Sequence, residues 1–372
     1  MTSRERTMAI LNYEHCDRLP AVHFGYWDTL LTKWCREGHI TEEEANGYVD
    51  GNAADRSIGK KLGFDFNWQP GYRPNVGLNP PFDTKVIETL ADGSRKFLDG
   101  NGVIILQKPG ATSLPLEFDH MLKDRASWEG QFLPRLKYSA ERLQPQLLEK
   151  TASGCREDEA PLALHCGSLY GELRDLIGFQ EICYLSVEDE DLYTEIIDTV
   201  GQLSLDVVRH VLESGYTFDY AHFWEDICFK NGPMISPSVF REKVGPWYRK
   251  ITDYLCSHGV KIVSLDCDGV IDLLLPVWLE SGVNTMFPVE YGTWKADIAS
   301  WRQKYGKDLR AVGGMNKQVL CEDYAAVDRE IERLRPLIEL GGYIPCPDHR
   351  LPIGASWETT QYYCDRIKAL SF

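Results

Sequence analysis

Residues 260–274, VKIVSLDCDGVIDLL, hold the pattern that decides the fold. A short apolar run ends in Asp266, Cys267, Asp268 and Gly269. This pattern is typical of a buried strand whose polar residues lie at its carboxyl end. Two kinds of site are compatible with the aspartates. They resemble the nucleophile and acid/base pair of a haloacid dehalogenase-type phosphotransferase, or they offer two carboxylates to a metal ion.

Similar apolar runs alternate with helical patterns from about residue 155 onward. Segments 236–259 and 321–342 carry apolar residues at three-to-four spacing and end at glycine, as amphipathic helices do. This alternation predicts an α/β fold with a parallel sheet. The predicted strands are 161–168, 217–226, 260–269, 284–292, 308–317 and 341–349. Together with 19–27 and one further segment they would complete a (β/α)8 TIM barrel; an open doubly wound sheet is the alternative.

The predicted strands end in polar or chemically distinctive residues. In a (β/α)8 barrel all carboxyl ends face one mouth, where active sites lie. We therefore expect a site there, drawn from His165, Glu225, Asp266 with Asp268, Glu290, Asn316, and Cys346 with Asp348 and His349.

The N-terminal third has a different pattern. Segment 85–108 contains three extended pieces separated by Asp-Gly and Asp-Gly-Asn-Gly turns, which predicts a β-meander. Segment 66–82 is crowded with aromatic residues and prolines and is better explained by an ordered loop over a site than by a helix. We predict one domain over 1–372, with 64–120 as a lid or insertion over the barrel mouth.

Composition excludes some classes of function. The formal net charge of −16 opposes binding to nucleic acid, and no dense run of Lys or Arg offsets it. No apolar run reaches the roughly 18 residues of a membrane span, and the N-terminus lacks a secretory signal pattern. The 11 cysteines show no regular spacing, which indicates reduced thiols and a cytoplasmic protein.

The order of residues after Asp268 argues against a phosphotransferase. That fold requires a later strand ending in Ser or Thr, a Lys and a late acidic pair. The later strand ends instead offer Glu290, Asn316 and the CPDH group at 346–349, and the remaining chain is short.

The metal hypothesis uses the two-residue period of a strand. Asp266 and Asp268 point the same way and can converge on one ion, while Cys267 points toward a helix. Cys346 and His349 follow the last strand, and Glu225 and His222 end another, so all could contribute to an open Zn²⁺ site. The alternative is that the aspartates only cap a helix or pair with Arg and Lys.

Other candidate residues also allow a functional and a structural explanation. His349 beside Asp348 could be an acid/base pair or part of a turn. Cys346 could be a small buried hydrophobe. His165 could reach a ligand or bond a backbone carbonyl. Four aromatic residues could form a substrate-binding wall or belong to the core: Trp68, Tyr72, Trp224 and Tyr291.

Six segments make the chain resemble the uroporphyrinogen decarboxylase superfamily of (β/α)8 barrels. They are RERTMAILNYEHCDRLP (4–20), GSLYGELRDLIGFQE (167–181), WEDICFKNGPMISPSVFREKVGPWYRKI (224–251), DCDGVIDLLLPVWLESGVN (266–284), PVEYG (288–292) and GGYIPCPDHRLP (341–352). Porphyrinogen decarboxylases carry an arginine-rich N-terminal signature for substrate carboxylates. The corresponding stretch here, HFGYWDTLL (23–31), contains no arginine, so the resemblance favours the other branch, the corrinoid-dependent methyltransferases.

Some of these methyltransferases bind zinc through His-x-Cys and a distant Cys. Asp266 falls where that His would be, Asp268 where the first Cys would be, and Cys346 close to the last. With aspartates in place of that His and the first Cys, the site is less suited to a thiol as the acceptor of the methyl group. The resemblance is therefore better to the substrate-demethylating components of O-demethylase systems.

This resemblance implies a zinc-dependent methyltransferase that moves a methyl group from a methyl ether, expected to be a methoxylated aromatic, to the Co(I) of a separate corrinoid protein. The expected metal ligands are Asp266, Asp268, Cys346 and Glu225; the expected catalytic residues are His349, His222 and Asp348; and the expected substrate-binding residues are Trp68, Tyr72, Trp224, Tyr291, His165 and Asn316. The chain has no corrinoid-binding Asp-x-His-x-x-Gly motif, so the corrinoid belongs to the partner.

The resemblance also allows a homodimer, as in some relatives. A decarboxylase or lyase and a non-catalytic binding barrel remain the alternatives.

Overall fold

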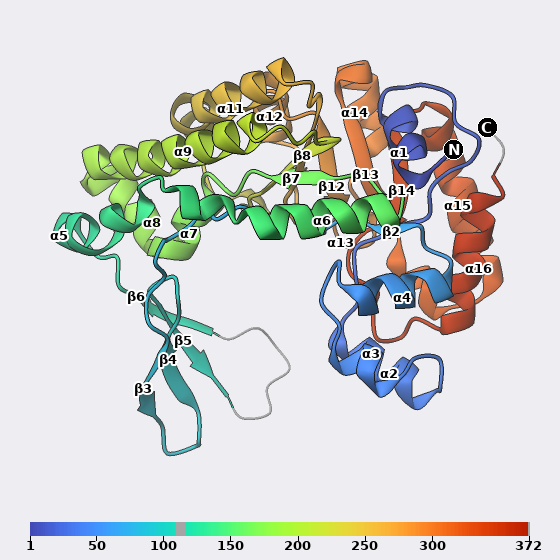
Figure 1. Cartoon of the computed structure of the whole chain (residues 1–372), viewed down its shortest axis with the longest axis horizontal. Helices are drawn as coiled ribbons and strands as arrows, with labels where there is room; N and C mark the ends of the chain where they lie inside the picture. The colour runs from blue at the N-terminus through green and yellow to red at the C-terminus, as the bar shows by residue number, and fades with distance from the viewer. Residues whose placement is uncertain (109–115, 371–372) are drawn as a thin grey trace.

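A six-stranded parallel sheet forms the centre of the molecule in the computed structural model, which describes residues 1–108 and 116–370 (Figure 1). Its strands lie side by side in chain order: β7 (Ala163–His165), β8 (Tyr220–Trp224), β11 (Ile262–Asp266), β12 (Thr285–Val289), β13 (Arg310–Met315) and β14 (Tyr343–Pro347). The six strands predicted after residue 155 are thus confirmed. Their order runs in one direction, without the switch point of a doubly wound sheet.

Two short N-terminal strands also run parallel. β1 (Val22–His23) pairs with β2 (Phe66–Asn67). An isolated bridge joins Tyr72, beyond β2, to Leu164 of β7, and another joins Tyr26, beyond β1, to Leu351 beyond β14. These bridges place the N-terminal strands beside both ends of the six-stranded sheet, an arrangement consistent with the predicted TIM barrel.

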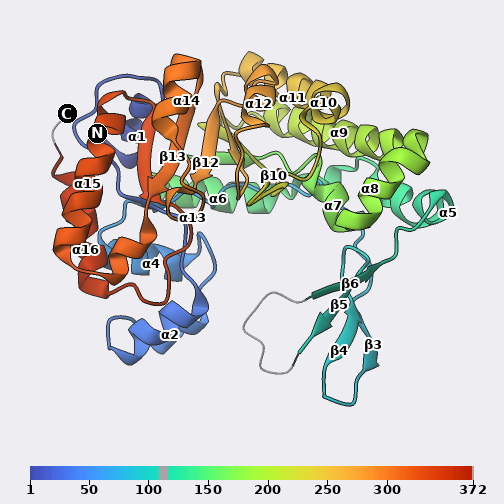
Figure 2. The ribbon, with the colours of Figure 1, turned by 180° about the vertical axis from the view of Figure 1, so that it is seen from behind.

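Helices connect the parallel strands and cover the sheet (Figures 1 and 2). Those before the second sheet are α1 (Ser3–Leu11), α2 (Asp28–Arg36), α3 (Glu42–Asn46) and α4 (Ala53–Leu62). Next come α5 (Arg125–Ser127), α6 (Pro145–Glu157), α7 (Gly171–Ile177), α8 (Phe179–Glu188), α9 (Glu190–Glu213), α10 (Pro237–Val239) and α11 (Gly245–Ser257). The last are α12 (Leu275–Glu280), α13 (Tyr291–Trp294), α14 (Ile298–Tyr305), α15 (Tyr324–Glu339) and α16 (Trp357–Lys368).

Because helices cover the strands, β8, β11, β12 and β14 are buried along almost their whole length. This explains their mostly apolar sequences, in which His222 of β8 and Ser264 of β11 are buried polar exceptions. The hairpin of β9 (Cys228–Phe229) and β10 (Gly232–Pro233) follows β8 at that edge. Among the described residues, no helix is long and apolar enough to cross a membrane.

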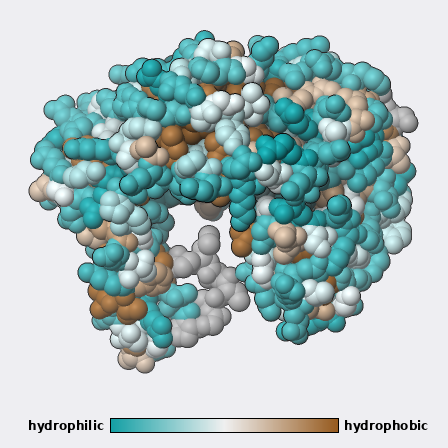
Figure 3. Space-filling view, in the orientation of Figure 1, coloured by the Kyte–Doolittle hydropathy of each residue, from teal (hydrophilic) through white to brown (hydrophobic). Residues whose placement is uncertain are grey.

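A separate antiparallel sheet projects from the body of the molecule (Figures 1 and 2). It is a meander of β3 (Lys85–Thr89), β4 (Arg95–Leu98), β5 (Val103–Gln107) and β6 (Leu116–His120). The first three strands are the extended pieces predicted over 85–108. Apolar side chains of the sheet, among them Ile87 and Phe118, are exposed (Figure 3). Part of the predicted lid 64–120, residues 109–115, lies outside the described residues, and its role as a lid stays a prediction.

Candidate functional site

Three carboxylates converge at the carboxyl ends of β8 and β11. Asp226, Asp266 and Asp268 each place one oxygen within 4.8 Å of the others. Asp226 adopts a left-handed backbone conformation with φ of 50°, which turns the chain directly after β8. One oxygen of Asp226 accepts the backbone N–H of Asp268 at 3.0 Å. The two strand ends are therefore held together at the cluster.

The two-residue period predicted that Asp266 and Asp268 would face the same region, and both join the cluster. Asp268 lies just beyond the end of β11, so the turn that follows must keep it there. Gly269 makes this turn possible, with φ of 97°. A Cβ atom at Gly269 would lie 2.7 Å from the backbone of Cys228, so only glycine fits beneath the β9–β10 hairpin.

The carboxylates are placed where negative charge is costly. Burial raises the pKa of Asp266 well above its usual range, and the charges of Asp268 and Asp226 raise it further. Burial also raises the pKa of Asp226, with Asp268 adding to the effect. Gln69 partly compensates, because its Nε2 donates to Asp266 Oδ2 at 2.6 Å. Such a group is stabilised by a bound cation or by protonation.

His222 supplies a nitrogen beside the cluster. Its Nε2 lies 4.0 Å from Asp266 Oδ2, is buried, and has no hydrogen-bond partner among the described residues. Its Nδ1 lies 3.2 Å from Ser264 Oγ. Burial, followed by the nearby charge of Arg73, lowers the pKa of His222 to about 3, which keeps the ring neutral. A proton on Nδ1 leaves the Nε2 lone pair free, the form in which histidine binds metals.

These residues fit a divalent metal ion. Two buried atoms of these residues, His222 Nε2 and Asp268 Oδ1, find no hydrogen-bond partner within 1–108 and 116–370. Zn²⁺ accepts carboxylate oxygen and imidazole nitrogen in one site, and the contact between His222 and Ser264 is the outer support that such histidines commonly have. The candidate ligands are therefore Asp226, Asp266, Asp268 and His222.

Glu225, an expected ligand, lies outside this cluster. Its carboxylate accepts the backbone N–H groups of Leu169, Tyr170 and Gly171, at 2.7–3.3 Å, and the hydroxyl of Ser168 at 3.1 Å. Tyr248 of α11 also donates to it. Glu225 thus caps the N-terminus of α7, on the helix-covered side of the sheet, and its oxygens are already occupied.

Cys346 does not join the cluster either. Its thiol is buried, and burial followed by Asp348 raises its pKa well above the usual range. A charge on Cys346 would raise the pKa of Tyr343 in β14 and of Tyr363 in α16, so its thiol lies near these two side chains. Among the described residues, the group brought together by the structure contains neither Cys346 nor Glu225.

Asp348 and His349, the expected acid/base pair, lie in different surroundings. The carboxylate of Asp348 is buried and accepts the backbone N–H groups of Gly292 and Lys317. His349 does reach the cluster, because its Nε2 lies 3.5 Å from Asp268 Oδ2. Its ring stacks on Trp27 and meets Phe24 edge-on. His349 is therefore held beside the carboxylates, whereas Asp348 joins α13 to the 3-10 turn that follows β13.

Three expected substrate-binding residues are buried near the sheet. Trp68 stacks on Tyr220, with ring centroids 4.5 Å apart, and is fully buried. Tyr72 is also fully buried and donates its hydroxyl to the carbonyl of Leu143. His165 meets His222 edge-on, and its Nε2 lies 3.0 Å from the carbonyl of Gln69. His165 therefore lies closest to the cluster, while the two aromatic side chains pack as core.

The other three lie around the edge of the sheet. Trp224 lies beneath the guanidinium of Arg174, 5.4 Å from its ring centroid. Tyr291 packs in the same way against Arg333, at 3.6 Å. Asn316 accepts the backbone N–H of Gln318 and caps the 3-10 turn that follows β13. The structure thus gives each of them a structural partner.

Sequence reasoning missed Asp226, Gln69, Arg73 and the environment of Glu290. The signal for Asp226 was present, since the two-residue period that groups Asp266 with Asp268 also groups His222 with Asp226 and sends Glu225 to the opposite face. Burial, followed by the charge of Asp268, raises the pKa of Glu290 to about 7. One oxygen of Glu290 accepts the N–H groups of Gly269 and Trp294.

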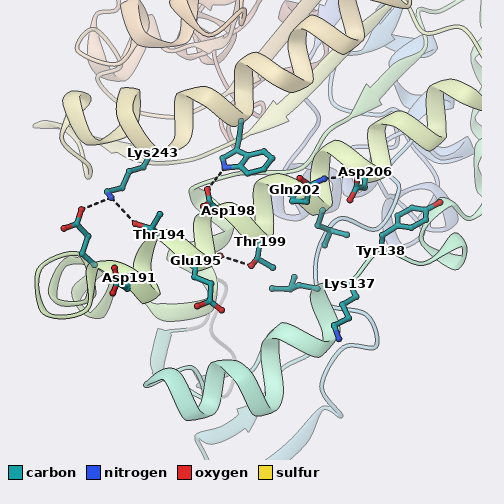
Figure 4. A pocket seen from close by; sticks show the side chains of 14 residues that line it. Lys137, Tyr138, Asp191, Thr194, Glu195, Asp198, Thr199, Gln202, Asp206 and Lys243 are labelled. Atoms are coloured by element: carbon teal, nitrogen blue, oxygen red, sulfur yellow. Dashed lines mark hydrogen bonds and ion pairs between the residues drawn. The ribbon is translucent and has the colours of Figure 1, made fainter.

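A cavity of about 970 Å³ lies elsewhere, along α9 (Figure 4). It is lined by Glu190, Asp198, Lys243 and Trp247, among others. These groups pair within the cavity wall: Lys243 with Glu190 at 2.8 Å, and Trp247 with Asp198 at 2.7 Å. The cavity contains none of the strand-end residues, so the chemistry is better sought at the carboxylate cluster.

Residues 138–370 match the uroporphyrinogen decarboxylase family. The chain belongs to this family. That match covers more than half of the chain, including every strand of the six-stranded sheet and all four candidate metal ligands. It confirms the family resemblance expected from the sequence.

A solved structure shows the same fold in a methyltransferase. This methyltransferase from Methanosarcina mazei superimposes with a TM-score of 0.64, over 99% of this chain and 98% of its own, at 16% sequence identity. At that identity the likeness establishes the fold and leaves the activity open. No curated protein has a matching sequence.

Proposed function

We propose that this chain is a zinc-dependent methyltransferase that transfers a methyl group from a methyl ether of a methoxylated aromatic compound to the Co(I) of a separate corrinoid protein. The observation that carries the proposal is the cluster of Asp226, Asp266 and Asp268 with His222 beside it, in which two buried atoms have no hydrogen-bond partner among the described residues. Family membership and a neighbour of the same fold that is a methyltransferase support it. The proposal includes a closed barrel with 64–120 over its mouth.

The ligand types favour an ether over a thiol as the group activated. A thiol acceptor is best held by a soft, thiolate-rich site, and this cluster offers three carboxylates and one imidazole. Bound there, Zn²⁺ would act as a Lewis acid on the ether oxygen and stabilise the charge that develops on the leaving group.

The protein residues around the cluster have distinct tasks in this proposal. Ser264 fixes the orientation of His222, and Gln69 holds Asp266 by its amide. In the reaction the bond between methyl carbon and ether oxygen breaks, and a bond between that carbon and cobalt forms. His349, held near Asp268 by Trp27 and Phe24, is placed to donate a proton to the product oxygen.

The test is methyl transfer with defined components. Purified chain, a reduced corrinoid protein and guaiacol-like ethers should give the absorbance of methyl-cobalt, and the isolated chain should contain about one zinc ion. Asp226→Asn should lose both zinc and transfer, while Glu225→Gln, the adjacent control, should keep zinc. A fully active chain free of metal would overturn the zinc site. Failure of every ether with zinc present would overturn the methyltransferase and leave a decarboxylase or a binding barrel.

A further inference from the structure

Arg73 is positioned at the carboxyl end of the sheet by the segment that follows β2. Tyr72 exchanges backbone hydrogen bonds with β7, donating to Ala163 and accepting from His165, both at 2.9 Å. Gly71 permits this approach, because a Cβ atom there would lie 2.7 Å from the Cβ of Ala163. The backbone on which Arg73 lies is therefore fixed at the edge where the carboxylates converge.

The guanidinium of Arg73 has N–H groups that form no hydrogen bond with the described residues. Its Nη2 donates to the carbonyl of Gln69 at 3.1 Å and to the side-chain Oε1 of Gln69 at 2.9 Å. In residues 1–108 and 116–370, no protein group accepts from its Nε or Nη1, and no carboxylate lies within 4.0 Å of it. A chain of net charge −16 offers many carboxylates, yet Arg73 remains exposed without one.

Gln69 connects Arg73 to the cluster and also separates the two. Its Oε1 accepts from Arg73, and its Nε2 donates to Asp266, so both ends of the amide are used. The positive charge of Arg73 nevertheless reaches the site, because it contributes to lowering the pKa of His165 and His222. An arginine that served only to neutralise Asp266 would bond to that carboxylate directly.

The site thus has two poles: the carboxylate cluster with His222, and the free side of the Arg73 guanidinium. A guanidinium fork matches the two oxygens of a carboxylate. A ligand that spans both poles carries a neutral oxygen at one end and an anionic group at the other.

We propose that Arg73 binds a carboxylate of the methyl donor, so that the substrates are methoxylated aromatic acids. This inference rests on the proposed function and narrows its substrate class. It also explains how an anion enters a site rich in acidic residues, because Arg73 supplies the positive charge at the edge of that site.

The experiment compares two ligands of equal shape and different charge. 3-Methoxybenzoate and 3-methoxybenzamide are titrated calorimetrically into the zinc-loaded full chain and into the variants Arg73→Gln and Arg73→Lys. We expect the wild type to bind the benzoate at least about tenfold more tightly than the benzamide. Arg73→Gln should remove this preference, and Arg73→Lys should keep part of it, because lysine retains the charge without the fork.

The zinc content of Arg73→Gln should equal that of the wild type, since Arg73 binds the ligand and not the metal. Equal binding of the two compounds by the wild type, no binding of either, or a preference that survives Arg73→Gln would overturn the subsite. The proposed function fails in a different way. If it is wrong, no ether gives methyl-cobalt with the wild type, whereas failure of the subsite alone leaves transfer from neutral guaiacol-like ethers by the wild type intact.

Discussion

Glu225 and Asp226 are adjacent acidic residues at the end of β8, and their surroundings are opposite. The carboxylate of Glu225 accepts hydrogen bonds from Ser168, Tyr248 and three backbone N–H groups. The carboxylate of Asp226 faces two further aspartates. Glu225 is buried and its oxygens are hydrogen-bonded, as a structural carboxylate must be; Asp226 is half-buried beside like charges, which is tolerable where a cation binds.

The difference teaches that burial of an acidic residue does not by itself mark a functional site. Burial raises the pKa of both residues, so the direction of the shift does not separate them. The hydrogen bonds do separate them: five groups donate to the Glu225 carboxylate, whereas among the described residues the Asp226 carboxylate accepts from the backbone N–H of Asp268 and faces two further carboxylates. The predictions below test this contrast, beginning with the largest expected effect.

Asp266→Asn should abolish the metal site. The substitution removes the most buried charge of the cluster, and we expect zinc content to fall below detection and methyl transfer to fall by about 100-fold or more. The fold should persist, because the substitution also relieves like-charge repulsion with Asp226 and Asp268. Elemental analysis and the methyl-cobalt assay measure the two effects. Zinc retained at the wild-type level would show that Asp266 is no ligand.

Glu225→Gln should act on stability and leave the metal. Its amide nitrogen would oppose an N–H group at the N-terminus of α7, and the buried mismatch should lower the free energy of unfolding by roughly 2–4 kcal/mol. Chemical denaturation of the zinc-free chain measures this loss. If the variant instead lost zinc while keeping its stability, the contrast between Glu225 and Asp226 would be reversed.

Ser264→Ala should weaken the metal site moderately. Without the hydroxyl, His222 loses the partner of Nδ1, and zinc affinity should fall by about 10-fold. Competition with a zinc chelator gives the affinity. Cys346→Ala is the matched control, since Cys346 is buried near Tyr363 and should leave zinc affinity unchanged. A large loss in the control would return Cys346 to the ligand set.

Glu172→Gln should leave the metal site unchanged and alter stability alone, by an amount that depends on pH. Glu172 lies in the first turn of α7, and burial, with Asp175 and Glu225, raises its pKa to about 7. The folded state prefers the neutral acid. Glu172 therefore lowers the free energy of unfolding increasingly as the pH rises from the pKa of an unfolded glutamate to the folded-state pKa of about 7. At pH 8 the variant should be more stable by roughly 1–3 kcal/mol, and near pH 4 the two should agree. A difference that is equal at both pH values would contradict this assignment.

Much of the fold could be predicted from local patterns. Mostly apolar runs identified the six strands, because strands covered on both faces bury nearly all their side chains. The Asp-Gly turns identified the meander, since φ > 0 at Gly93 and Gly102 is a local requirement. The short strands β1 and β2 were harder, because two residues make no period and depend on distant partners.

The site was predicted in part. Asp266, Asp268 and His222 lie close together in the structure, because the period of a strand fixes which face each side chain takes, and their role as ligands stays a prediction. Glu225 was chosen over Asp226 although the same period favours Asp226, and Cys346 was chosen for its place at the end of the last strand and for the family resemblance. Gln69 and Arg73 carry no sequence signal, because their role depends on a segment about 200 residues from β11 reaching the same edge.

The sequence by itself determined the strands, their polar ends and the inward pairing of Asp266 with Asp268, because these follow from contacts between near neighbours in the chain. Only the tertiary structure decided which carboxylates are free. Glu225 is hydrogen-bonded at the N-terminus of α7, and Cys346 is buried near Tyr363 of α16. Asp226 and His222 instead lie beside Asp266 and Asp268. The physical reason is that a buried polar group is defined by its partners, and here those partners come from distant parts of the chain.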